Sequence, residues 1–419
     1  MLQSKLFTKT KKEFPADETS NNARFLIQAG YIFKEMAGVY SLLPLGVRVI
    51  QKIENIIREE MNKIGGLEMK TSILQNKEVW EKTGRWDDNA VDNWFKSTLK
   101  NGSEVGLSFT NEEAYANIMK SYISSYKDLP VYPYDFKSIF RNEARSKSGV
   151  MRGREFYWKA LYSFSKNKEE HDRFYEKAEE AYRNVFEKVG LGEKTYLTFA
   201  SGGTFSKFSH EFQTLSEAGE DTVYVDFEKK IAVNKEVLTD EILEDLELDK
   251  EKLVEKKAIE VGNIFTLGYK FSDPIDLKYK NKEGEEERVF MGSYGIGITR
   301  LMGTIVECFS DEKGIVWPES VSPFKVHILS LFRSEEDEAF HVAKNLYEKL
   351  SARGVEVLFD DRENKTPGEK FSDADLIGLP WRVVVSEKSL AAGGIEIKKR
   401  NENESKIISI EEFLDNYSY

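Results

Sequence analysis

The chain has 419 residues, of which 40% are hydrophobic and 32% charged, a composition that predicts a soluble globular protein of two or three domains. No apolar run approaches the roughly 20 residues of a membrane span, and the N-terminal stretch is too polar for a secretory signal, so we expect a cytoplasmic protein. The single Cys308 excludes an intrachain disulfide and a cysteine-based zinc site. The net charge of −12 argues only weakly against a nucleic-acid partner, because the distribution of charge decides more than its sum.

The N-terminal part of the chain predicts helices and short strands. We expect a short helix over 21–30 and an amphipathic helix over 47–64, whose apolar residues recur at helical spacing and which Gly65-Gly66 ends. Strands are expected over 67–74 and 107–110, and a helix over 111–126.

The middle of the chain predicts an antiparallel pair of strands. Residues 137–145 and 155–164 have strand character and are joined by a basic loop that contains glycine. A helix over 168–188, strands over 260–272 and 288–293 and an apolar helix from about Thr299 are expected to follow. Residues 237–257 have the composition of an exposed, acidic and helix-prone insertion.

A domain boundary is predicted at the Pro-containing segment 317–323. Beyond it, strands over 325–331, 356–360 and 382–385 alternate with helices over 335–352 and 368–377, which predicts an α/β module with parallel pairing. We therefore divide the chain into residues 1–320, with a short acidic insertion at 235–258, and residues 323–419.

Two segments combine residue types that suit a nucleotide. Arg141 and Glu143 lie two positions apart on an expected strand, which would place both side chains on one face, and the returning strand brings Arg154 and Phe156. In the second segment, three glycines precede Arg300 at the start of a helix. Arginines for phosphate, an aromatic face for adenine and a glycine-rich strand indicate an ATP site, and the chain has no P-loop sequence.

Taken in chain order, six segments resemble the class II aminoacyl-tRNA synthetases, and most closely the prolyl-tRNA synthetases of the bacterial type. They are 38–46 with the helix that follows (motif 1), 110–113, 140–164 (motif 2), 209–212, 260–268 and 292–300 (motif 3). Two further segments, 360–362 and 374–380, lie in the C-terminal module, so that the resemblance covers nearly the whole chain.

The resemblance implies an α+β catalytic domain, an antiparallel sheet flanked by helices, followed by an α/β anticodon-binding domain. It also implies the ATP-dependent attachment of L-proline to tRNA(Pro) through a prolyl-adenylate, with release of pyrophosphate and AMP. Mg²⁺ would arrive with ATP, no protein-bound metal is expected, and motif 1 would form the interface of a homodimer. Because no covalent nucleophile is needed, catalysis would consist of orientation and charge stabilisation.

The resemblance assigns roles to individual residues. Arg141 would bridge the α-phosphate and the carboxylate, and Arg300 would hold the γ-phosphate, which makes these two the catalytic candidates. The expected ATP-binding residues are Arg141, Glu143, Arg152, Arg154, Phe156, Glu260, Gly297 and Arg300. The expected proline-binding residues are Thr110, Glu112, Arg141, Trp158, His210, Asn263, Phe265 and Ser293. The expected tRNA contacts are Arg145, Lys147, Asp361, Arg362 and Lys370.

Thr110 and Glu112 also suit the substrate on chemical grounds. The protonated secondary amine of proline has two N–H donors, so its site needs two acceptors, at least one of them anionic. The alternative for Glu112 is a solvated position at a helix N-terminus, where carboxylates are favoured.

The chain departs from the family pattern at several positions, none of which removes a residue expected to bind phosphate or the amine: Ser72, Phe109, Asn111, Ser146, Lys147, Ala160 and Asn263. The region 234–260 is too short for the editing domain that many bacterial relatives insert there.

Two alternatives remain open. A synthetase for threonine would need the cysteine and paired histidines of a zinc-based pocket, which the sequence does not provide. A non-catalytic tRNA-binding paralogue would be expected to lose the phosphate-binding arginines, and both are present.

Overall fold

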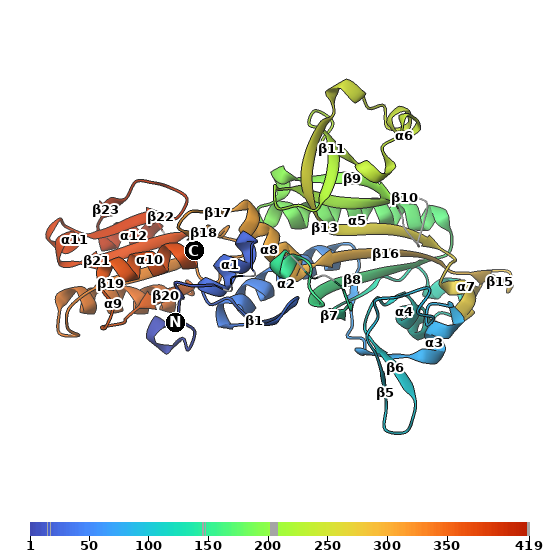
Figure 1. The fold of residues 1–419 in the computed structure, drawn as a ribbon, viewed down its shortest axis with the longest axis horizontal. Helices are drawn as coiled ribbons and strands as arrows, with labels where there is room; N and C mark the ends of the chain where they lie inside the picture. The colour runs from blue at the N-terminus through green and yellow to red at the C-terminus, as the bar shows by residue number, and fades with distance from the viewer. Residues whose placement is uncertain (15, 17, 145, 147, 202–207, 417–419) are drawn as a thin grey trace. The chain divides into compact units, whose positions relative to one another are not determined.

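The computed structural model describes the chain except for residues 15, 17, 145, 147, 202–207 and 417–419 (Figure 1). Contacts group the chain into two compact units. The central unit comprises residues 36–39 and 54–304, and the C-terminal unit comprises residues 1–35, 40–53 and 305–419. Within the described residues, no helix combines the length and the apolar character needed to cross a membrane.

A nine-stranded sheet forms the core of the central unit, and most of its neighbouring strands are antiparallel. The strands pair in the order β10 (Phe208–Leu215), β9 (Thr195–Ser201), β12 (Ile231–Asn234), β11 (Asp221–Asp226), β13 (Val254–Gly268), β16 (Phe290–Gly297), β8 (Glu155–Ser165), β7 (Pro133–Phe140) and β3 (Leu67–Glu68). The β9–β12 and β3–β7 pairs are parallel. The predicted antiparallel pairing of the two motif 2 strands is confirmed by β7 and β8.

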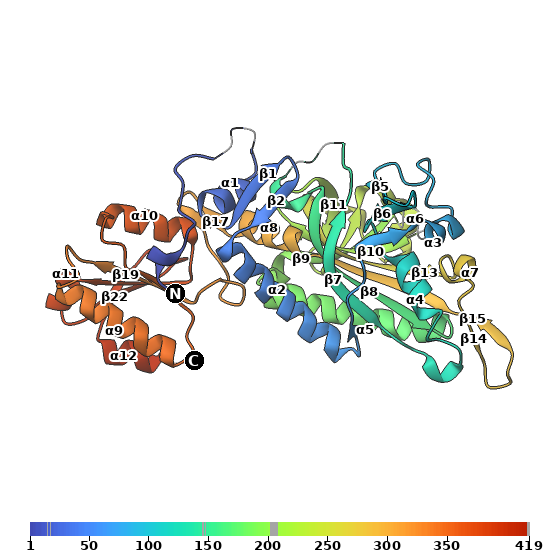
Figure 2. The same cartoon turned by 90° about the horizontal axis from the view of Figure 1, so that it is seen from below.

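The helix α5 covers part of one face of this sheet. The predicted helix 168–188 is confirmed as α5 (Lys168–Lys188), which the Asn167 side chain caps by accepting from the Glu170 backbone N–H at 2.9 Å. Its buried stripe, Phe174, Ala178, Ala181, Tyr182 and Val185, repeats every three or four residues. Figure 2 shows α5 running alongside β8. Lys159 of β8 reaches the Tyr182 hydroxyl on this face, so Trp158 and Ala160 project to the opposite face.

The remaining elements of the central unit are short, except for α2, which begins in the C-terminal unit, and α8, which ends there. The helices are α2 (Pro44–Lys63), α3 (Lys77–Lys82), α4 (Glu112–Met119), α6 (Asp240–Asp245), α7 (Ser272–Ile275) and α8 (Ile298–Cys308). The minor strands are β4 (Leu74–Asn76), β6 (Glu104–Leu107) and β5 (Lys96–Thr98) in one sheet, and β14 (Lys278–Lys280) with β15 (Glu286–Arg288) in another.

Several predicted strands are shorter than the sequence indicated. The expected strand 67–74 is divided into β3 and β4, because Thr71 hydrogen-bonds to the Asp135 side chain instead of to a neighbouring strand. The expected strand 107–110 ends at Leu107, and the expected strand 137–145 ends at Phe140. Arg141 and Glu143 therefore lie in the loop after β7, and the prediction that both stand on a strand was wrong.

The acidic insertion has a small core of its own. Only α6 and short 3₁₀ turns are helical there, because Ile242, Leu243 and Leu248 are buried with Val233 of β12. The expected exposed helix is thus a segment packed on a strand. Figure 1 shows α6 at the end of the projection that contains β11.

The C-terminal unit contains a five-stranded sheet in the order β20 (Val357–Asp360), β19 (Val326–Leu331), β21 (Trp381–Ser386), β22 (Ile395–Lys399) and β23 (Lys406–Ile408). The predicted parallel pairing is confirmed for β19 with β20 and β21, whereas the antiparallel β22 and β23 were not predicted. The helices are α1 (Asn21–Gln28), α9 (Glu338–Ala352), α10 (Pro367–Ile377), α11 (Glu387–Ala391) and α12 (Ile410–Asn416). The minor strands are β1 (Ile32–Met36), β2 (Val39–Leu42), β17 (Ser310–Asp311) and β18 (Gly314–Ile315).

Candidate active site

Two cavities lie on the face of the central sheet opposite α5. The first has a volume of about 280 Å³ and the second of about 230 Å³, and four residues line both of them: Arg141, Trp158, Glu260 and Arg300. The first cavity is also lined by Glu143, Arg152, Phe156 and Gly297, and the second by Thr110, Glu112, Asn263, Phe265 and Ser293. Most of the residues predicted for ATP and most of those predicted for proline thus gather in adjoining cavities, with Arg154 and His210 as the exceptions.

The Arg141 guanidinium lies between two aromatic rings, 5.1 Å from the Phe109 centroid and 5.4 Å from the Phe156 centroid. Its Nε is buried and has no hydrogen-bond partner among the described residues. Burial lowers the pKa of Arg141, and the nearby positive charge of Arg300 adds to this effect. A buried guanidinium with free donors is a binding site for an oxyanion such as a phosphate or a carboxylate.

Arg300 is held in place by the carbonyl and the side chain of one residue. It donates to the Glu260 backbone oxygen at 2.8 Å and to the Glu260 carboxylate at 3.1 Å, and its Nε donates to the Met151 carbonyl at 2.9 Å. Asn263 donates to the other oxygen of the Glu260 carboxylate at 2.7 Å. Glu260 therefore connects Asn263, which lines the second cavity, to Arg300, which lines both cavities.

Glycines in β16 allow the wall between the cavities to form. A Cβ atom at Gly295 would lie 2.2 Å from Trp158 Cζ2, and one at Gly297 would lie 3.3 Å from Trp158 Cζ3. Any larger residue at Gly295 would displace the indole, so this glycine is required by close approach. The predicted glycine-rich strand thus serves to seat Trp158.

An acidic side chain at the start of α4 lines the second cavity. Glu112 is 4% exposed and accepts from the Tyr162 hydroxyl at 3.0 Å, from the Thr110 hydroxyl and from Arg85 at 3.3 Å. The alternative of a solvated N-terminal carboxylate is therefore wrong for Glu112, although the residue does begin the helix. Arg85 and Tyr162 were not predicted, because neither stands within a recognisable spacing.

A second carboxyl group lies directly behind Glu112. Glu113 is fully buried and accepts from Arg85 at 3.0 Å and from the Thr83 hydroxyl at 2.9 Å. Burial raises its pKa to about 7, against the opposing positive charge of Arg85. The carboxylate facing the cavity and the one behind it thus differ in their surroundings, although they are adjacent in sequence.

The loop after β7 is stabilised by arginines. Arg152 donates to Glu143 at 3.2 Å and to Glu220 at 2.9 Å. Arg154 does not line either cavity; it donates to the backbone oxygens of Glu143 and Ala37, at 3.0 and 2.7 Å. Arg154 therefore stabilises the loop that carries Glu143.

His210 also lies away from both cavities. Its Nδ1 is 2.9 Å from the hydroxyl of Tyr175, a residue of α5, and burial lowers its pKa. The β10 register places Glu211 rather than His210 on the cavity face, opposite Asn263. Burial and the charge of Glu260 raise the pKa of Glu211 to about 8. The proline-binding role of His210 stays a prediction.

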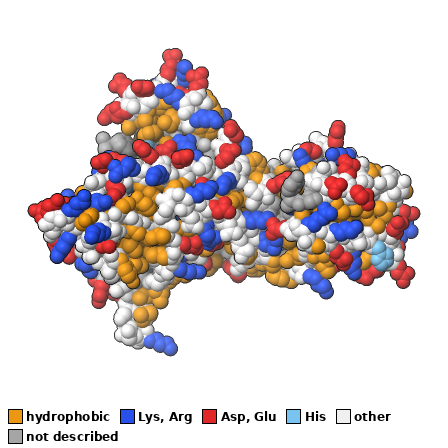
Figure 3. All heavy atoms as spheres, turned by 180° about the vertical axis from the view of Figure 1, so that it is seen from behind, with side chains coloured by type: hydrophobic (Ala, Val, Ile, Leu, Met, Phe, Trp, Pro, Cys, Tyr) orange, Lys and Arg blue, Asp and Glu red, His pale blue; other side chains and the backbone are white. Residues whose placement is uncertain are grey.

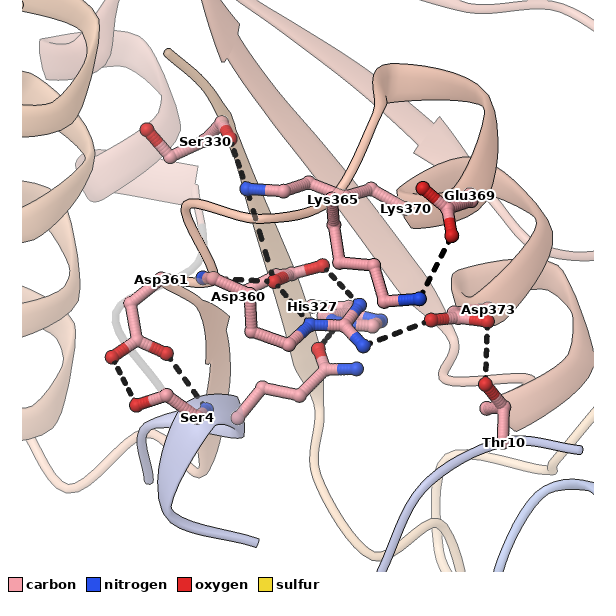
Figure 4. A network of polar contacts seen from close by, with 12 residues as sticks. Ser4, Thr10, His327, Ser330, Asp360, Asp361, Lys365, Glu369, Lys370 and Asp373 are labelled. Atoms are coloured by element: carbon pink, nitrogen blue, oxygen red, sulfur yellow. Dashed lines mark hydrogen bonds and ion pairs between the residues drawn. The ribbon is translucent and has the colours of Figure 1, made fainter. Parts of the chain in front are cut away.

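The residues predicted to bind tRNA fall into two groups. Arg145 and Lys147 lie outside the described residues. Asp361, Arg362 and Lys370 belong to a polar network in the C-terminal unit, in which Figure 4 labels Asp361 and Lys370. On the face shown in Figure 3, acidic and basic side chains are interspersed instead of gathered by sign.

The network in the C-terminal unit engages these three side chains. Arg362 donates to both oxygens of Asp360, at 2.8 and 2.7 Å, and pairs with Asp373 at 2.9 Å. Lys370 is 2% exposed and donates to the Ser330 carbonyl at 2.8 Å, and Asp361 accepts from Ser4 (Figure 4). Their tRNA contacts stay predictions.

No group of three or more His, Cys, Asp or Glu side chains that could hold a metal ion occurs among the described residues. The carboxylates of Glu260 and Asp221 do line the first cavity. Carboxylate oxygens are ligands that Mg²⁺ prefers, and Mg²⁺ commonly binds one or two of them together with the phosphates of a nucleotide.

Comparison with known proteins gives two family matches. Residues 94–309 match the tRNA synthetase class II core domain (G, H, P, S and T), and residues 324–417 match an anticodon binding domain. Curated relatives include a proline--tRNA ligase of Hyphomonas neptunium, 36% identical and covering 99% of both chains. Another, from Nitrobacter winogradskyi, is 37% identical and covers 98% of both.

The fold is similar to that of a solved prolyl-tRNA synthetase from Cryptosporidium parvum in complex with L-proline and AMP. The TM-score is 0.76 at 18% identity, over 95% of this chain and 75% of the other. A structure of the protein from the same organism with halofuginone and AMPPNP gives 0.78 at 17% identity, over 95% and 77%.

Proposed function

The chain belongs to the class II aminoacyl-tRNA synthetases, among the proline--tRNA ligases, and we propose that its two cavities join L-proline to the terminal ribose of tRNA(Pro). The observation that carries the proposal is the buried Nε of Arg141 at the junction of the cavities, which has no partner among the residues that the structure describes. A carboxylate in the second cavity and a phosphate in the first would meet at this guanidinium. Two oxyanions that repel each other in water are brought together by a positive charge between them.

In the first step the proline carboxylate oxygen attacks the α-phosphorus of ATP, and the bond to the β-phosphate oxygen breaks to release pyrophosphate. Arg141 neutralises the charge that accumulates on the α-phosphate, and Arg300 binds the terminal phosphate. Since Arg300 is paired with Glu260 at 3.1 Å, ATP would compete with Glu260 for the Arg300 guanidinium. Glu260 and Asp221 would then be free to hold Mg²⁺ brought by ATP.

The proline amine would lie against the Thr110–Glu112 pair. Its two N–H groups need two acceptors, and the Glu112 carboxylate supplies one that is charged, at 4% exposure. The aromatic rings of Trp158 and Phe265 supply an apolar wall for the pyrrolidine ring. The combination selects a cyclic amino acid that is cationic at one end and apolar at the other.

In the second step a hydroxyl of the terminal ribose of tRNA attacks the prolyl carbonyl and AMP leaves. The anticodon-binding match at 324–417 supports tRNA as the acceptor. We place the reaction in the cytoplasm, as the composition predicts.

A homodimer is part of the proposal. Large apolar side chains are exposed in and beside the motif 1 segment: Leu67 is 60% exposed, Ile73 41% and Leu74 52%. A second copy bound in isologous fashion would cover them. Light scattering at micromolar protein concentration would return a dimer mass, and a monomer mass would contradict this part.

The short insertion bears on accuracy. Its buried residues Ile242 and Leu243 pack on β12, and the segment contains neither His nor Cys for hydrolysis. Alanine is smaller than proline, and each methylene that it lacks contributes only about 1–3 kcal/mol of discrimination against it. We therefore expect some alanyl-tRNA(Pro) to form and the enzyme not to hydrolyse it. Enzyme-dependent deacylation above the spontaneous rate would show otherwise.

The activity is tested by ATP–pyrophosphate exchange with each of the twenty amino acids, followed by charging of tRNA(Pro). Proline should support the fastest exchange. Exchange that depends on another amino acid, or on none, would refute the proposal.

A further inference from the structure

Lys137 is a buried lysine of β7 that the reaction scheme does not use. The residue is 4% exposed, and its ammonium group donates three hydrogen bonds: to the Thr71 hydroxyl at 2.7 Å, to the Ser72 carbonyl at 3.0 Å and to Asn111 Oδ1 at 3.0 Å. An ammonium has three donors, so this one is fully satisfied. A buried lysine with complete hydrogen bonding fixes the relative positions of all the groups that it joins.

The three acceptors lie on two separate segments. Asn111 lies between Thr110 and Glu112, the two residues proposed to hold the proline amine. Its own backbone N–H donates to the Tyr162 hydroxyl at 3.2 Å, and that hydroxyl donates to the Glu112 carboxylate at 3.0 Å. A shift of Asn111 would therefore move the carboxylate both through the chain and through Tyr162.

The other segment runs from Thr71 to Leu74 and lies between β3 and β4. This segment is held to β7, because the Thr71 N–H and hydroxyl both donate to the fully buried Asp135. The carboxylate of Asp135 lies 4.0 Å from the Lys137 ammonium and balances its charge. The segment ends in the exposed apolar residues Ile73 and Leu74.

We propose that Lys137 is a positioning residue for the amino-acid site, which fixes the Thr110–Glu112 loop against the segment 71–74. The inference rests on the proposed function for the identity of the substrate. Lys137 contacts no substrate and acts through Asn111. Because it also binds Thr71 and Ser72, the position of the loop depends on how well the segment 71–74 is ordered. A second copy of the chain would cover that segment.

The test compares three variants of the full-length enzyme in pyrophosphate exchange, with Lys137→Met as the direct one. Loss of the ammonium should raise KM for proline about 10-fold, and KM for ATP should change less than about 2-fold, since the hydrogen bond that joins Lys137 to the loop at Asn111 is lost together with its two bonds to Thr71 and Ser72. An equal change in both constants, or none in KM for proline, would overturn the proposal.

Thr71→Val is the second variant, because Lys137→Met also leaves Asp135 without its cation and could impair folding. It removes one acceptor of Lys137 without touching a cavity, and we expect KM for proline to rise about 3-fold. Thr222→Val is the matched control. Thr222 lies on β11, and its hydroxyl accepts a hydrogen bond from Lys257 at 3.1 Å. This variant should leave KM for proline unchanged. If Thr71→Val behaves as Thr222→Val does, the proposal is wrong.

A double-mutant cycle separates positioning from general loosening. If Lys137 acts by placing the Glu112 carboxylate, the KM increases of Lys137→Met and Glu112→Gln combine to less than their product. Increases that multiply independently would assign Lys137 to stability alone. The assay uses whichever amino acid the wild-type enzyme activates. If the wild type does not activate proline, the proposed function is refuted, but the same variants still test whether Lys137 positions the amino-acid site.

Discussion

In the central unit, Arg141 Nε is buried beside two cavities and has no hydrogen-bond partner among the described residues. In the C-terminal unit, Arg362 donates to Asp360 from two nitrogens and pairs with Asp373, and Lys370 is bonded to a carbonyl inside the fold. Both groups of cations were predicted to bind a polyanion. Arg141 keeps a donor without a partner among the described residues, whereas Arg362 and Lys370 use their donors to hold the protein together.

The difference follows from what surrounds each cation. Arg141 lies between the rings of Phe109 and Phe156, which desolvate its charge without satisfying its N–H donors. Arg362 lies across Asp360, which is fully buried and has Lys370 as a second, more distant cation at 3.9 Å. A cation therefore indicates a ligand site when its neighbours exclude water and leave its donors free.

Replacing Arg141 tests the first half of this comparison. Arg141→Ala should lower proline-dependent exchange on the order of 100-fold or more, because the charge-stabilising donor at the reacting phosphate is lost. Its melting temperature should stay near that of wild type, since no ion pair with the described residues is broken. Arg183→Ala, which removes an exposed helical pair, is the control. Near wild-type exchange in Arg141→Ala would contradict the mechanism.

Replacing Arg362 tests the second half. Arg362→Ala removes the nearer of the two cations of the buried Asp360, leaving Lys370 at 3.9 Å, and should cost at most about 3 kcal/mol of unfolding free energy in the C-terminal unit. Denaturant unfolding would measure this, with the exposed Arg333→Ala as the control. Proline-dependent exchange at low temperature should be retained. A variant that keeps full stability but fails to bind tRNA would assign Arg362 to RNA contact instead.

Replacing Glu112 tests whether a carboxylate that already accepts hydrogen bonds from the protein can still bind the proline amine. Glu112→Gln keeps the shape and removes the charge that faces the amine, and KM for proline should rise roughly 10-fold. KM for ATP should barely change, and exposed Glu155→Gln should alter neither. Equal losses for both substrates would point to a structural role for Glu112 within the Arg85 network.

The spacing of the sequence motifs was sufficient to predict most residues that line the cavities. It did not predict the residues that hold those side chains in position. The phosphate and amine residues stand next to glycines, aromatics and helix starts, which are local signals. Lys137 and Tyr162 stand on the two strands predicted to pair and Arg85 in a separate segment, and no pattern along the chain shows that these side chains meet the Thr110–Glu112 loop. The strand for Arg141 and Glu143 was wrong because periodicity does not show where β7 leaves the sheet at Phe140.

The C-terminal unit shows the same limit. Alternating strands and helices predicted β19, β20 and β21 correctly. The antiparallel β22 and β23 are only five and three residues long, too short for the alternation of Ile395 and Ile397 with polar residues to stand out as a strand. That Lys370 is buried could not be foreseen from a charged residue on a helix, since its acceptor, the Ser330 carbonyl, is 40 positions away.

The smallest effect is expected from the carboxyl group behind Glu112. Burial raises the pKa of Glu113 to about 7, above the value of about 4.3 for an unfolded chain. The folded state therefore binds more protons than the unfolded state between these values, and this group makes the protein less stable as pH rises from about 4 to 7, with no further change above that range. Glu113→Gln removes the titration, so the melting temperature of the variant relative to wild type should rise by about 2–4 °C between pH 5 and pH 8. Exposed Glu176→Gln should show no such trend. A constant difference between Glu113→Gln and wild type across this range would mean that Arg85 keeps Glu113 ionised, and that both carboxylates at the start of α4 are charged when proline binds.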